Sequence, residues 1–234
     1  MADRFFTPEP LALGEFILDG PEAHHLVHVR RFSTGDTVNL FNGDGREYEA
    51  EIREISKKRV VLNLLRMRTP QRELGFVLHI GAALPKGDRA DFLIEKLTEL
   101  GVTDFTPLLT ERSVVLPKES KTEKLQRAVI EASKQCGRNV LLRVHPPARL
   151  ERWCQLQSIM EAKWIAHPTD ELGGSKEAIR GGIAVAIGPE GGFSDEEVAA
   201  AERAGFRRLG LGPRILRVET AAVAIAAQIG SSLN

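Results

Sequence analysis

The stretch Ile183-Ala-Val-Ala-Ile-Gly-Pro-Glu-Gly-Gly192 decides the fold class of this chain. Its first five residues are all apolar, which is typical of a β-strand that is covered on both faces, as in a parallel sheet. A loop of three glycines, a proline and a glutamate follows, and Ser194 and Glu197 then have the spacing of a capping box at the start of a helix. A buried strand, a tight loop and a helix in direct succession predict an α/β domain.

Strands and helices alternate on both sides of this stretch, from Gly75 almost to the C-terminus. The hydrophobic pattern predicts strands at 76–80, 105–109, 140–144, 163–166 and 208–211, and helices at 88–100, 122–136, 150–160, 194–204 and 219–229. Such alternation indicates a parallel sheet with helices on both faces. We therefore expect an α/β domain over residues 73–234.

The first 72 residues have a different pattern, with short alternating segments separated by glycines. Residues 37–41, 47–52 and 59–65 are predicted as strands, and Asn42-Gly-Asp-Gly45 is a strong turn signal between the first two. These features indicate a small β barrel or sandwich. Thr69-Pro-Gln71 is expected to be the linker, so the predicted domains are residues 1–72 and 73–234.

Composition narrows the class of protein. The chain has 234 residues, 32 basic and 32 acidic side chains, and two cysteines, Cys136 and Cys154, which form neither a disulfide framework nor a C-x-x-C metal motif. No apolar run is long enough to cross a bilayer, and Met1–Pro10 lacks the apolar core of a signal peptide. We expect a cytosolic protein without a membrane segment. With zero net charge, it would have to bind a nucleic acid through local basic patches.

The loop Gly188–Gly192 is the first of three segments that follow predicted strands, which is where ligands bind in open α/β sheets. Its glycines let the backbone approach a ligand closely, although a tight turn without a ligand is the alternative. Neither Gly-x-x-x-x-Gly-Lys-Ser/Thr nor Gly-x-Gly-x-x-Gly is present. Their absence argues against a nucleoside triphosphate or a dinucleotide.

The second segment, Leu209–Thr220, runs into a helix of mostly small residues. Arg214, Arg217 and Glu219 are charged side chains set inside this otherwise apolar stretch. They are either solvated loop charges or part of a functional site. Their closeness to the predicted sheet edge favours the site.

The third segment, Ala83-Leu-Pro-Lys-Gly-Asp-Arg89, ends the first strand of the α/β domain. Lys86 and Arg89 lie at the start of the helix that follows, where a positive charge opposes the helix dipole. Cations in such a position suggest an anionic partner, and RNA phosphate would suit them.

Several motifs in series resemble those of the RsmE family, and the resemblance covers nearly the whole chain. The motifs are His24-His-Leu-Val-His-Val-Arg-Arg31, Ala83-Leu-Pro-Lys-Gly-Asp-Arg89, Lys96-x-x-Glu-Leu-Gly-Val102, Thr110-Glu-Arg-Ser113, Glu131-Ala-Ser-Lys-Gln-Cys-Gly-Arg138, Ile187-Gly-Pro-Glu-Gly-Gly-Phe-Ser194 and Leu211-Gly-Pro-Arg-Ile-Leu-Arg-Val-Glu-Thr-Ala221. The Cys136-Gly137 pair departs from the family pattern, without consequence for the chemistry.

The resemblance implies a SPOUT fold, with a parallel sheet and a deep C-terminal trefoil knot, preceded by a PUA-like RNA-binding barrel. It implies a homodimer and methylation of N3 of a uridine in 16S ribosomal RNA, either naked or in the small ribosomal subunit. The cofactor would be S-adenosylmethionine (SAM), bound in a bent form. The residues that would hold it are Ala166, His167, Gly188, Pro189, Glu190, Gly191, Gly192, Leu211, Gly212, Ile215, Leu216, Thr220 and Ala221.

Methylation at N3 requires loss of a proton, which leaves negative charge on the uracil oxygens. A cationic donor beside those oxygens stabilises the anion. We expect Arg217 first, and Arg138 second, in this role. Glu219 or Glu190 would take the proton or orient the base. Glu219 has an equally plausible alternative, because a carboxylate at the start of a helix interacts favourably with its dipole.

RNA contacts are expected from basic side chains in three parts of the chain, namely Arg30, Arg31, Lys86, Arg89 and Arg112. A zinc site is not expected. His24 and His28 lie four residues apart, but His25 occupies the glutamate position of a His-Glu-x-x-His motif.

Two rival hypotheses come from other classes of protein. In one, the chain is an RNA-binding protein whose knotted domain serves only for dimerisation. In the other, it is an α/β enzyme that binds a nucleotide through the Gly188 loop.

Overall fold

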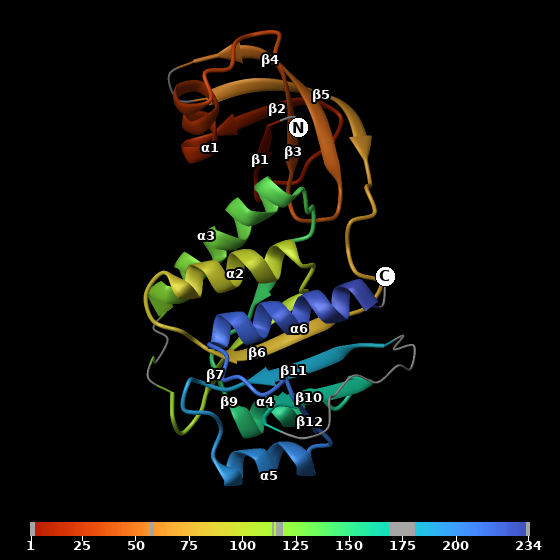
Figure 1. The fold of residues 1–234 in the computed structure, drawn as a ribbon. Coiled ribbons are helices and arrows are strands. Elements are labelled where there is room, and N and C mark those ends of the chain that lie inside the picture. The colour runs from red at the N-terminus through yellow and green to blue at the C-terminus, as the bar shows by residue number, and fades with distance from the viewer. Residues whose placement is uncertain (1–2, 57–58, 114, 116–118, 169–180, 233–234) are drawn as a thin grey trace. The chain divides into compact units, whose positions relative to one another are not determined.

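The computed structural model describes residues 3–56, 59–113, 115, 119–168 and 181–232 (Figure 1). The chain divides into an N-terminal unit, Met1–Glu73 with Ile130–Leu141, and a C-terminal unit, Leu74–Val129 with Leu142–Asn234. The expected domain boundary lies close to the join at Glu73. Residues 130–141, predicted as part of the C-terminal domain, group with the N-terminal unit. None of the helices in the described part of the chain has the length and apolar character needed to cross a membrane.

The N-terminal unit is built on a five-stranded sheet with the order β1-β3-β4-β5-β2. Its strands are β1 (Arg4–Phe6), β2 (Gly14–Asp19), β3 (Thr37–Phe41), β4 (Glu47–Ile55) and β5 (Arg59–Arg68). β1 pairs parallel with β3, and the other pairs are antiparallel. The three predicted strands are confirmed. Their inward side chains form a fully buried core that includes Leu40, Ile52 and Leu62.

A short helical segment that the sequence analysis did not predict connects β2 to the rest of this unit. It consists of the α-helix α1 (Gly20–His24) and the π-helix η1 (His25–Val29). Leu26 and Ala23 anchor it in the core, and α1 packs against β2 and β5.

The C-terminal unit contains a parallel sheet with the order β12-β10-β11-β6-β7-β8, in which β9 also pairs with β7. The strands are β6 (Leu78–Ala83), β7 (Asp104–Leu109), β8 (Arg143–Val144), β9 (Ala148–Arg149), β10 (Ala162–Ala166), β11 (Ile183–Ile187) and β12 (Arg207–Leu209). Every residue of β6 and β11 is buried, as the continuous apolar pattern predicted. The predicted parallel α/β architecture is confirmed.

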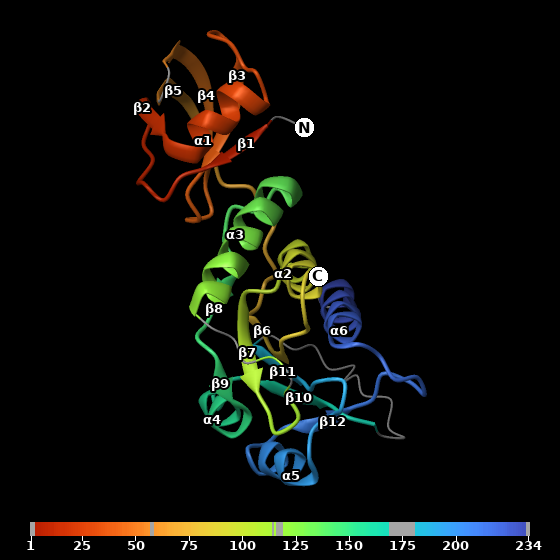
Figure 2. The same cartoon turned by 90° about the vertical axis from the view of Figure 1, so that its left-hand side faces the viewer.

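Helices cover both faces of this sheet (Figures 1 and 2). α2 (Arg89–Glu99) and α6 (Val218–Ser232) pack against each other on one face, and α4 (Leu150–Leu156) and α5 (Asp195–Arg203) on the other. The predicted capping box is present at the start of α5: Ser194 Oγ accepts from the Glu197 N–H, and Glu197 Oε2 accepts from the Ser194 N–H. α3 (Glu119–Cys136) begins in this unit and ends in the N-terminal one.

Two predicted elements are shorter than expected. The strand expected at 140–144 is reduced to β8 because the preceding residues bond to the N-terminal unit: Val140 forms a bridge with Asp44, and the Asn139 carbonyl accepts from the Gly45 N–H. The helix expected at 150–160 ends at Leu156, because the Gln157 and Met160 amides already make turn hydrogen bonds.

The end of the chain returns to the middle of the sheet. β12 lies at the sheet edge next to β10, yet α6, which follows it, packs against β6 and β11. The trefoil knot expected from the family resemblance would involve this final segment, and it stays a prediction.

Candidate functional site

The carboxyl ends of five parallel strands meet along one edge of the C-terminal sheet. Ala166 of β10 is in register with Ile187 of β11 on one side and with Leu209 of β12 on the other. Farther along, Ile187 is paired with Ala82 of β6. Adjacent strands lie about 4.8 Å apart, so the glycine loops after β11 and β12 leave the sheet roughly 10 Å from each other. The loop after β6 leaves the same edge, and this shared edge is the candidate site.

The loop 188–192 is a tight turn held rigidly from one side. The Gly192 N–H donates to the Pro189 carbonyl over 2.8 Å, and Gly192 has a φ of +71°, which favours glycine. A Cβ on Gly188 would lie 3.1 Å from the Phe193 ring. The loop therefore needs glycine at both positions, and its other side is bare backbone that a ligand can approach.

The loop after β7 supports this turn. Arg112 Nη1 donates to the Gly191 carbonyl over 2.8 Å, and the Glu111 N–H donates to Glu197 Oε1 over 2.8 Å. Arg112 was predicted to contact RNA. Its described bonds give it a positioning role at the glycine turn, and an RNA contact stays a prediction.

A charged cluster joins the loops after β6 and β11 to the first turn of α6. Arg89 Nη1 lies 3.1 Å from Glu190 Oε1 and 3.5 Å from Glu219 Oε1. The Glu219 side chain is only 8% exposed, whereas that of Glu190 is 48% exposed. Glu219 Oε2 is buried and has no hydrogen-bond partner among the described atoms. A buried carboxylate oxygen without a partner is costly, and a ligand that donates a hydrogen bond would satisfy it.

The remaining cations of this edge are open to solvent. Lys86, Arg214 and Arg217 are exposed, and in the part of the chain that the structure describes no hydrogen bond or ion pair engages the guanidinium of Arg214 or Arg217. Ile215, between the two arginines, is 95% exposed. The loop after β12 therefore presents cations and an apolar side chain that the described residues leave uncovered.

His167 follows β10 between the two glycine loops, and its N–H donates to the Leu209 carbonyl. Burial, together with the positive charge of Arg208, lowers the pKa of its imidazole below the ordinary value. The neutral side chain at this position suits a ligand group that is neutral or positively charged.

Arg138, the second catalytic prediction, lies in the N-terminal unit. Its guanidinium is 3% exposed and donates through Nε and Nη2 to the Glu73 carboxylate, over distances of 2.6 to 3.2 Å. Its backbone carbonyl accepts from Arg4. The structure therefore gives Arg138 a structural role in that unit.

Arg30 and Arg31, predicted RNA contacts, also belong to the N-terminal unit. Arg30 forms an ion pair with Asp3, and Arg31 is exposed with a φ of +58°, which is uncommon for a residue other than glycine. They remain predictions for RNA binding.

The pairing of Arg89 with Glu219 was missed by the sequence analysis. The two residues lie far apart in the chain, and no local pattern indicates that they meet. Arg89 was predicted as an RNA contact because it is a cation at a helix start, and that contact stays a prediction. The negative charges of Glu190 and Glu219 offset its unfavourable interaction with the helix dipole.

The residues of this edge fit SAM, whose sulfonium is positive. An adenosine can approach the backbone of the turn at Gly192, where a Cβ would meet nothing within 4 Å, and the described residues leave one buried oxygen of Glu219 without a hydrogen-bond donor.

Comparisons with known proteins agree with this arrangement. Residues 72–230 match the family described as RNA methyltransferase domain, and residues 18–65 match the RNA methyltransferase PUA domain. A Synechocystis protein named ribosomal RNA small subunit methyltransferase E is 33% identical over 97% of this chain and 77% of its own length.

Two solved structures are similar over almost the whole chain. A Neisseria gonorrhoeae ribosomal RNA small subunit methyltransferase E bound to SAM has a TM-score of 0.91 and 29% identity, covering 99% of this chain and 98% of that one. A Legionella pneumophila protein in complex with SAM has a TM-score of 0.89 and 32% identity, with the same coverage.

Proposed function

Because this chain belongs to the ribosomal RNA small subunit methyltransferase E family, we propose that it transfers a methyl group from SAM to N3 of a uridine in 16S ribosomal RNA. SAM-dependent RNA methylation is the activity of the family. The acceptor atom and the 16S target come from the resemblance of its motifs. The observation that carries the proposal is the sheet edge at Ala166, where two glycine loops flank one strand end and a buried carboxylate oxygen lacks a partner.

The cofactor would lie across the carboxyl ends of β10, β11 and β12. Register supports this placement, because Ala166, Ile187 and Leu209 are aligned. We assign its contacts to the side chains and backbone of Ala166, His167, Gly188, Pro189, Glu190, Gly191, Gly192, Leu211, Gly212, Ile215, Leu216, Thr220 and Ala221.

SAM, when bound, supplies a methyl group on a positively charged sulfur that reacts with a nucleophile in line. The task of the chain is to present a deprotonated N3 to it. We assign Arg217 as the donor to a uracil carbonyl oxygen, where negative charge develops. The base must be unpaired to expose N3, because N3 is part of the pairing edge.

Glu219 is better suited than Glu190 to accept the N3 proton. Its carboxylate is the more buried of the two, and one of its oxygens is unoccupied, while Arg89 holds the other. Glu190 shares the same arginine from a more exposed position and would orient the base or the cofactor.

The family resemblance also implies a homodimer and a trefoil knot, and the composition predicts a cytosolic location. The dimer has support in the loop after β12, because Ile215 is almost fully exposed within one chain. A second copy covering this side chain would close the site to water. Analytical ultracentrifugation of the wild type and of Ile215→Asp tests this, with dimer and monomer as the expected results.

The function is tested by mass mapping of 16S rRNA from cells that lack the protein. We expect one N3-methyluridine to disappear and to return when the wild-type gene is restored, but not with Arg217→Ala. An unchanged map would refute the proposal.

Thermal melting discriminates the rival functions. S-adenosylhomocysteine should raise the melting temperature more than ATP or NAD does. Stronger protection by ATP or NAD would favour a nucleotide enzyme. If SAM releases no heat in isothermal titration calorimetry and does not change the melting temperature, the result would favour an RNA-binding protein with an inert C-terminal unit.

A further inference from the structure

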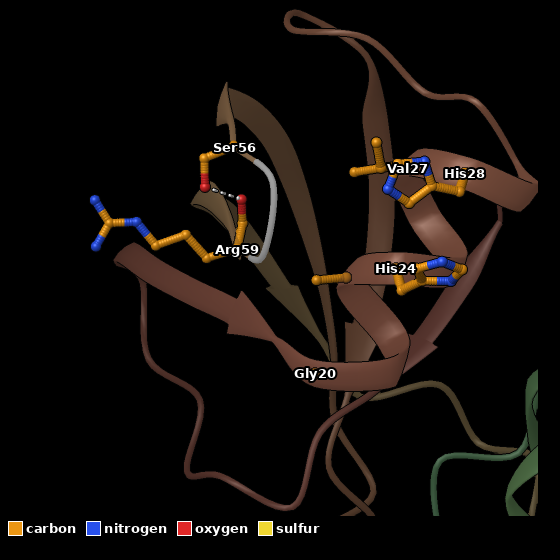
Figure 3. Close-up of a pocket in the computed structure, with 7 residues that line it drawn as sticks. Gly20, His24, Val27, His28, Ser56 and Arg59 are labelled. Atoms are coloured by element: carbon orange, nitrogen blue, oxygen red, sulfur yellow. Dashed lines mark hydrogen bonds between the residues drawn. The ribbon is translucent and has the colours of Figure 1, made fainter.

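A cavity of about 360 Å³ lies within the N-terminal unit, between the helical segment 20–29 and the residues at the end of β4 and the start of β5 (Figure 3). This volume falls in the range of small-ligand pockets, roughly 300 to 1,000 Å³. None of its described lining residues is acidic. They are Gly20, Ala23, His24, Val27, His28, Ser56 and Arg59.

The packing of the helical segment directs two histidines outward. Leu26 is fully buried, and the His25 ring packs edge-on against Phe5 at 6.0 Å. Residues four apart share a helix face, so His24 and His28 lie together, both exposed, with ring centroids 4.6 Å apart. The irregular π-helical turn from His25 to Val29 is a feature often found at functional sites.

Figure 3 shows the two imidazole rings side by side, with Val27 pointing toward the strands. Val27 and Ala23 give the cavity an apolar floor. The planes of the two rings are inclined at 44°, so an exposed ring face beside the apolar floor is available to a planar aromatic ligand.

Arg59 supplies a positive charge on the other side of the cavity. The Ser56 N–H and hydroxyl both donate to the Arg59 carbonyl, over 3.0 and 2.9 Å, which fixes the backbone at the start of β5. The Arg59 side chain is exposed and extends away from the floor (Figure 3), and the described residues offer its guanidinium no ion-pair partner. The acid nearest in sequence to the histidines, Glu22, is neutralised by Lys134 at 2.9 Å.

We propose that this cavity binds one unpaired nucleobase of RNA, stacked on one imidazole face of the His24–His28 pair, with the adjoining phosphate held by Arg59. A stacking surface beside a cation is the usual way in which single-stranded RNA is held without sequence readout. The described residues do not favour a metal ion, because no third His, Cys, Asp or Glu joins the two histidines. The cavity lies inside residues 18–65, which match the PUA domain of RNA methyltransferases. RNA as the ligand rests on the proposed function.

The test is fluorescence anisotropy of the full-length protein with labelled pentauridylate at fixed salt. Replacing both rings, His24→Ala with His28→Ala, should weaken binding roughly tenfold or more, because stacking on a side chain accounts for about that much per base. His24→Phe with His28→Phe should bind within about threefold of the wild type, because the rings remain. Wild-type affinity in the double alanine variant, or equal loss in both variants, would overturn the proposal.

Arg59→Ala tests the phosphate contact, with Arg66→Ala as the control, since Arg66 is an exposed arginine on the same strand but outside the cavity. Arg59→Ala should reduce the slope of log affinity against log salt by about 0.7, the value for one phosphate on a single strand. Arg66→Ala should change it less. Equal changes in the two variants would overturn the contact with Arg59.

Tripolyphosphate, which lacks bases, should compete poorly with pentauridylate for the wild type. Full competition at matched charge would show a phosphate site and refute the base pocket. SAM affinity and melting temperature should stay unchanged in every variant. If pocket variants lose RNA but the wild type fails to methylate rRNA, the pocket stands and the proposed function falls. If rRNA is methylated but the variants bind pentauridylate normally, the proposed function stands and the base pocket falls.

Discussion

The buried arginines Arg4 and Arg138 of the N-terminal unit and the exposed Arg217 at the edge of the C-terminal sheet differ in what neutralises them. In the N-terminal unit, Arg4 forms an ion pair with Glu47 at 2.7 Å and donates a hydrogen bond to Asn139. Arg138 forms an ion pair with Glu73. Burial lowers the pKa of Arg4. Burial alone would raise the pKa of Glu47, but hydrogen bonds from Arg72 and Arg4 hold it below its ordinary value. In this network the arginines are neutralised by carboxylates of the same chain.

The sheet edge differs in its exposed, unpaired cations, although among the described residues the first network also has one buried atom without a partner, Arg4 Nε. Arg217 is exposed, and Glu219 buries an oxygen that the described residues do not satisfy. A closed network contributes to stability, whereas an open one implies a partner from outside the chain. Substitutions in the first should therefore change stability, and substitutions in the second should change activity.

The largest effect is expected from Arg217→Ala. Removing one donor to a developing oxyanion typically costs a factor of about 10² to 10³ in rate, and we expect kcat for methylation of 16S rRNA to fall by that amount. SAM affinity should stay within a few-fold and the melting temperature unchanged, because the side chain is exposed. Arg214→Ala, in the same loop, is the control and should retain most of the activity. Intact turnover in Arg217→Ala would remove Arg217 from the mechanism.

The next effect, on stability, is expected from Arg138→Ala. Breaking a buried ion pair typically costs about 3 to 5 kcal/mol, and the partial exposure of Glu73 places this one near or below 3 kcal/mol. Hydrogen exchange of residues 130–141 should accelerate, and the thermal midpoint should fall. Arg68→Ala, which breaks an exposed pair with Glu49, should cost less than about 1 kcal/mol. Loss of methylation at unchanged stability in Arg138→Ala would support the prediction of a catalytic role and contradict the structural one.

The sequence was sufficient where the signal is local. The apolar run 183–187 and the spacing of Ser194 and Glu197 correctly predicted β11, the glycine turn and the start of α5. These features depend only on neighbours within a few residues. The alternation of strands and helices then determined the parallel sheet and its carboxyl edge.

The sequence failed where distant segments compete for the same residues. Val140 to Val144 has the pattern of a buried strand, but its first residues bond to the N-terminal unit. The bonds that Arg138 makes with Arg4, 134 residues away, and with Glu73 were likewise not indicated by any local pattern, and its role in catalysis stays a prediction. The π-helix at 25–29 was missed because no residue there signals a change of helical period.

A second closed network lies at the amino ends of the strands in the C-terminal unit. The smallest effect that we expect is the pH dependence of stability that this network causes. His79 of β6 is in register with Asp104 of β7, which bonds Arg143 and His145. Trp153 N–H, which can only donate, lies 3.3 Å from His79 Nε2, so this nitrogen is an acceptor and the imidazole is neutral.

Burial lowers the pKa of His79 to about 4, despite the opposing influence of Asp104. The unfolded chain, with an ordinary histidine pKa near 6.5, binds more protons between these two values. Stability should therefore be complete above about pH 6.5 and fall as the pH drops toward 4, by at most about 3 kcal/mol. In His79→Gln the fall between pH 6.5 and 4 should shrink, although the variant is less stable at pH 7. Urea midpoints measured across this range test it. If the urea midpoints of both proteins depend on pH in the same way, the pKa of His79 is not lowered by folding. The amino ends of these strands would then not form a closed network.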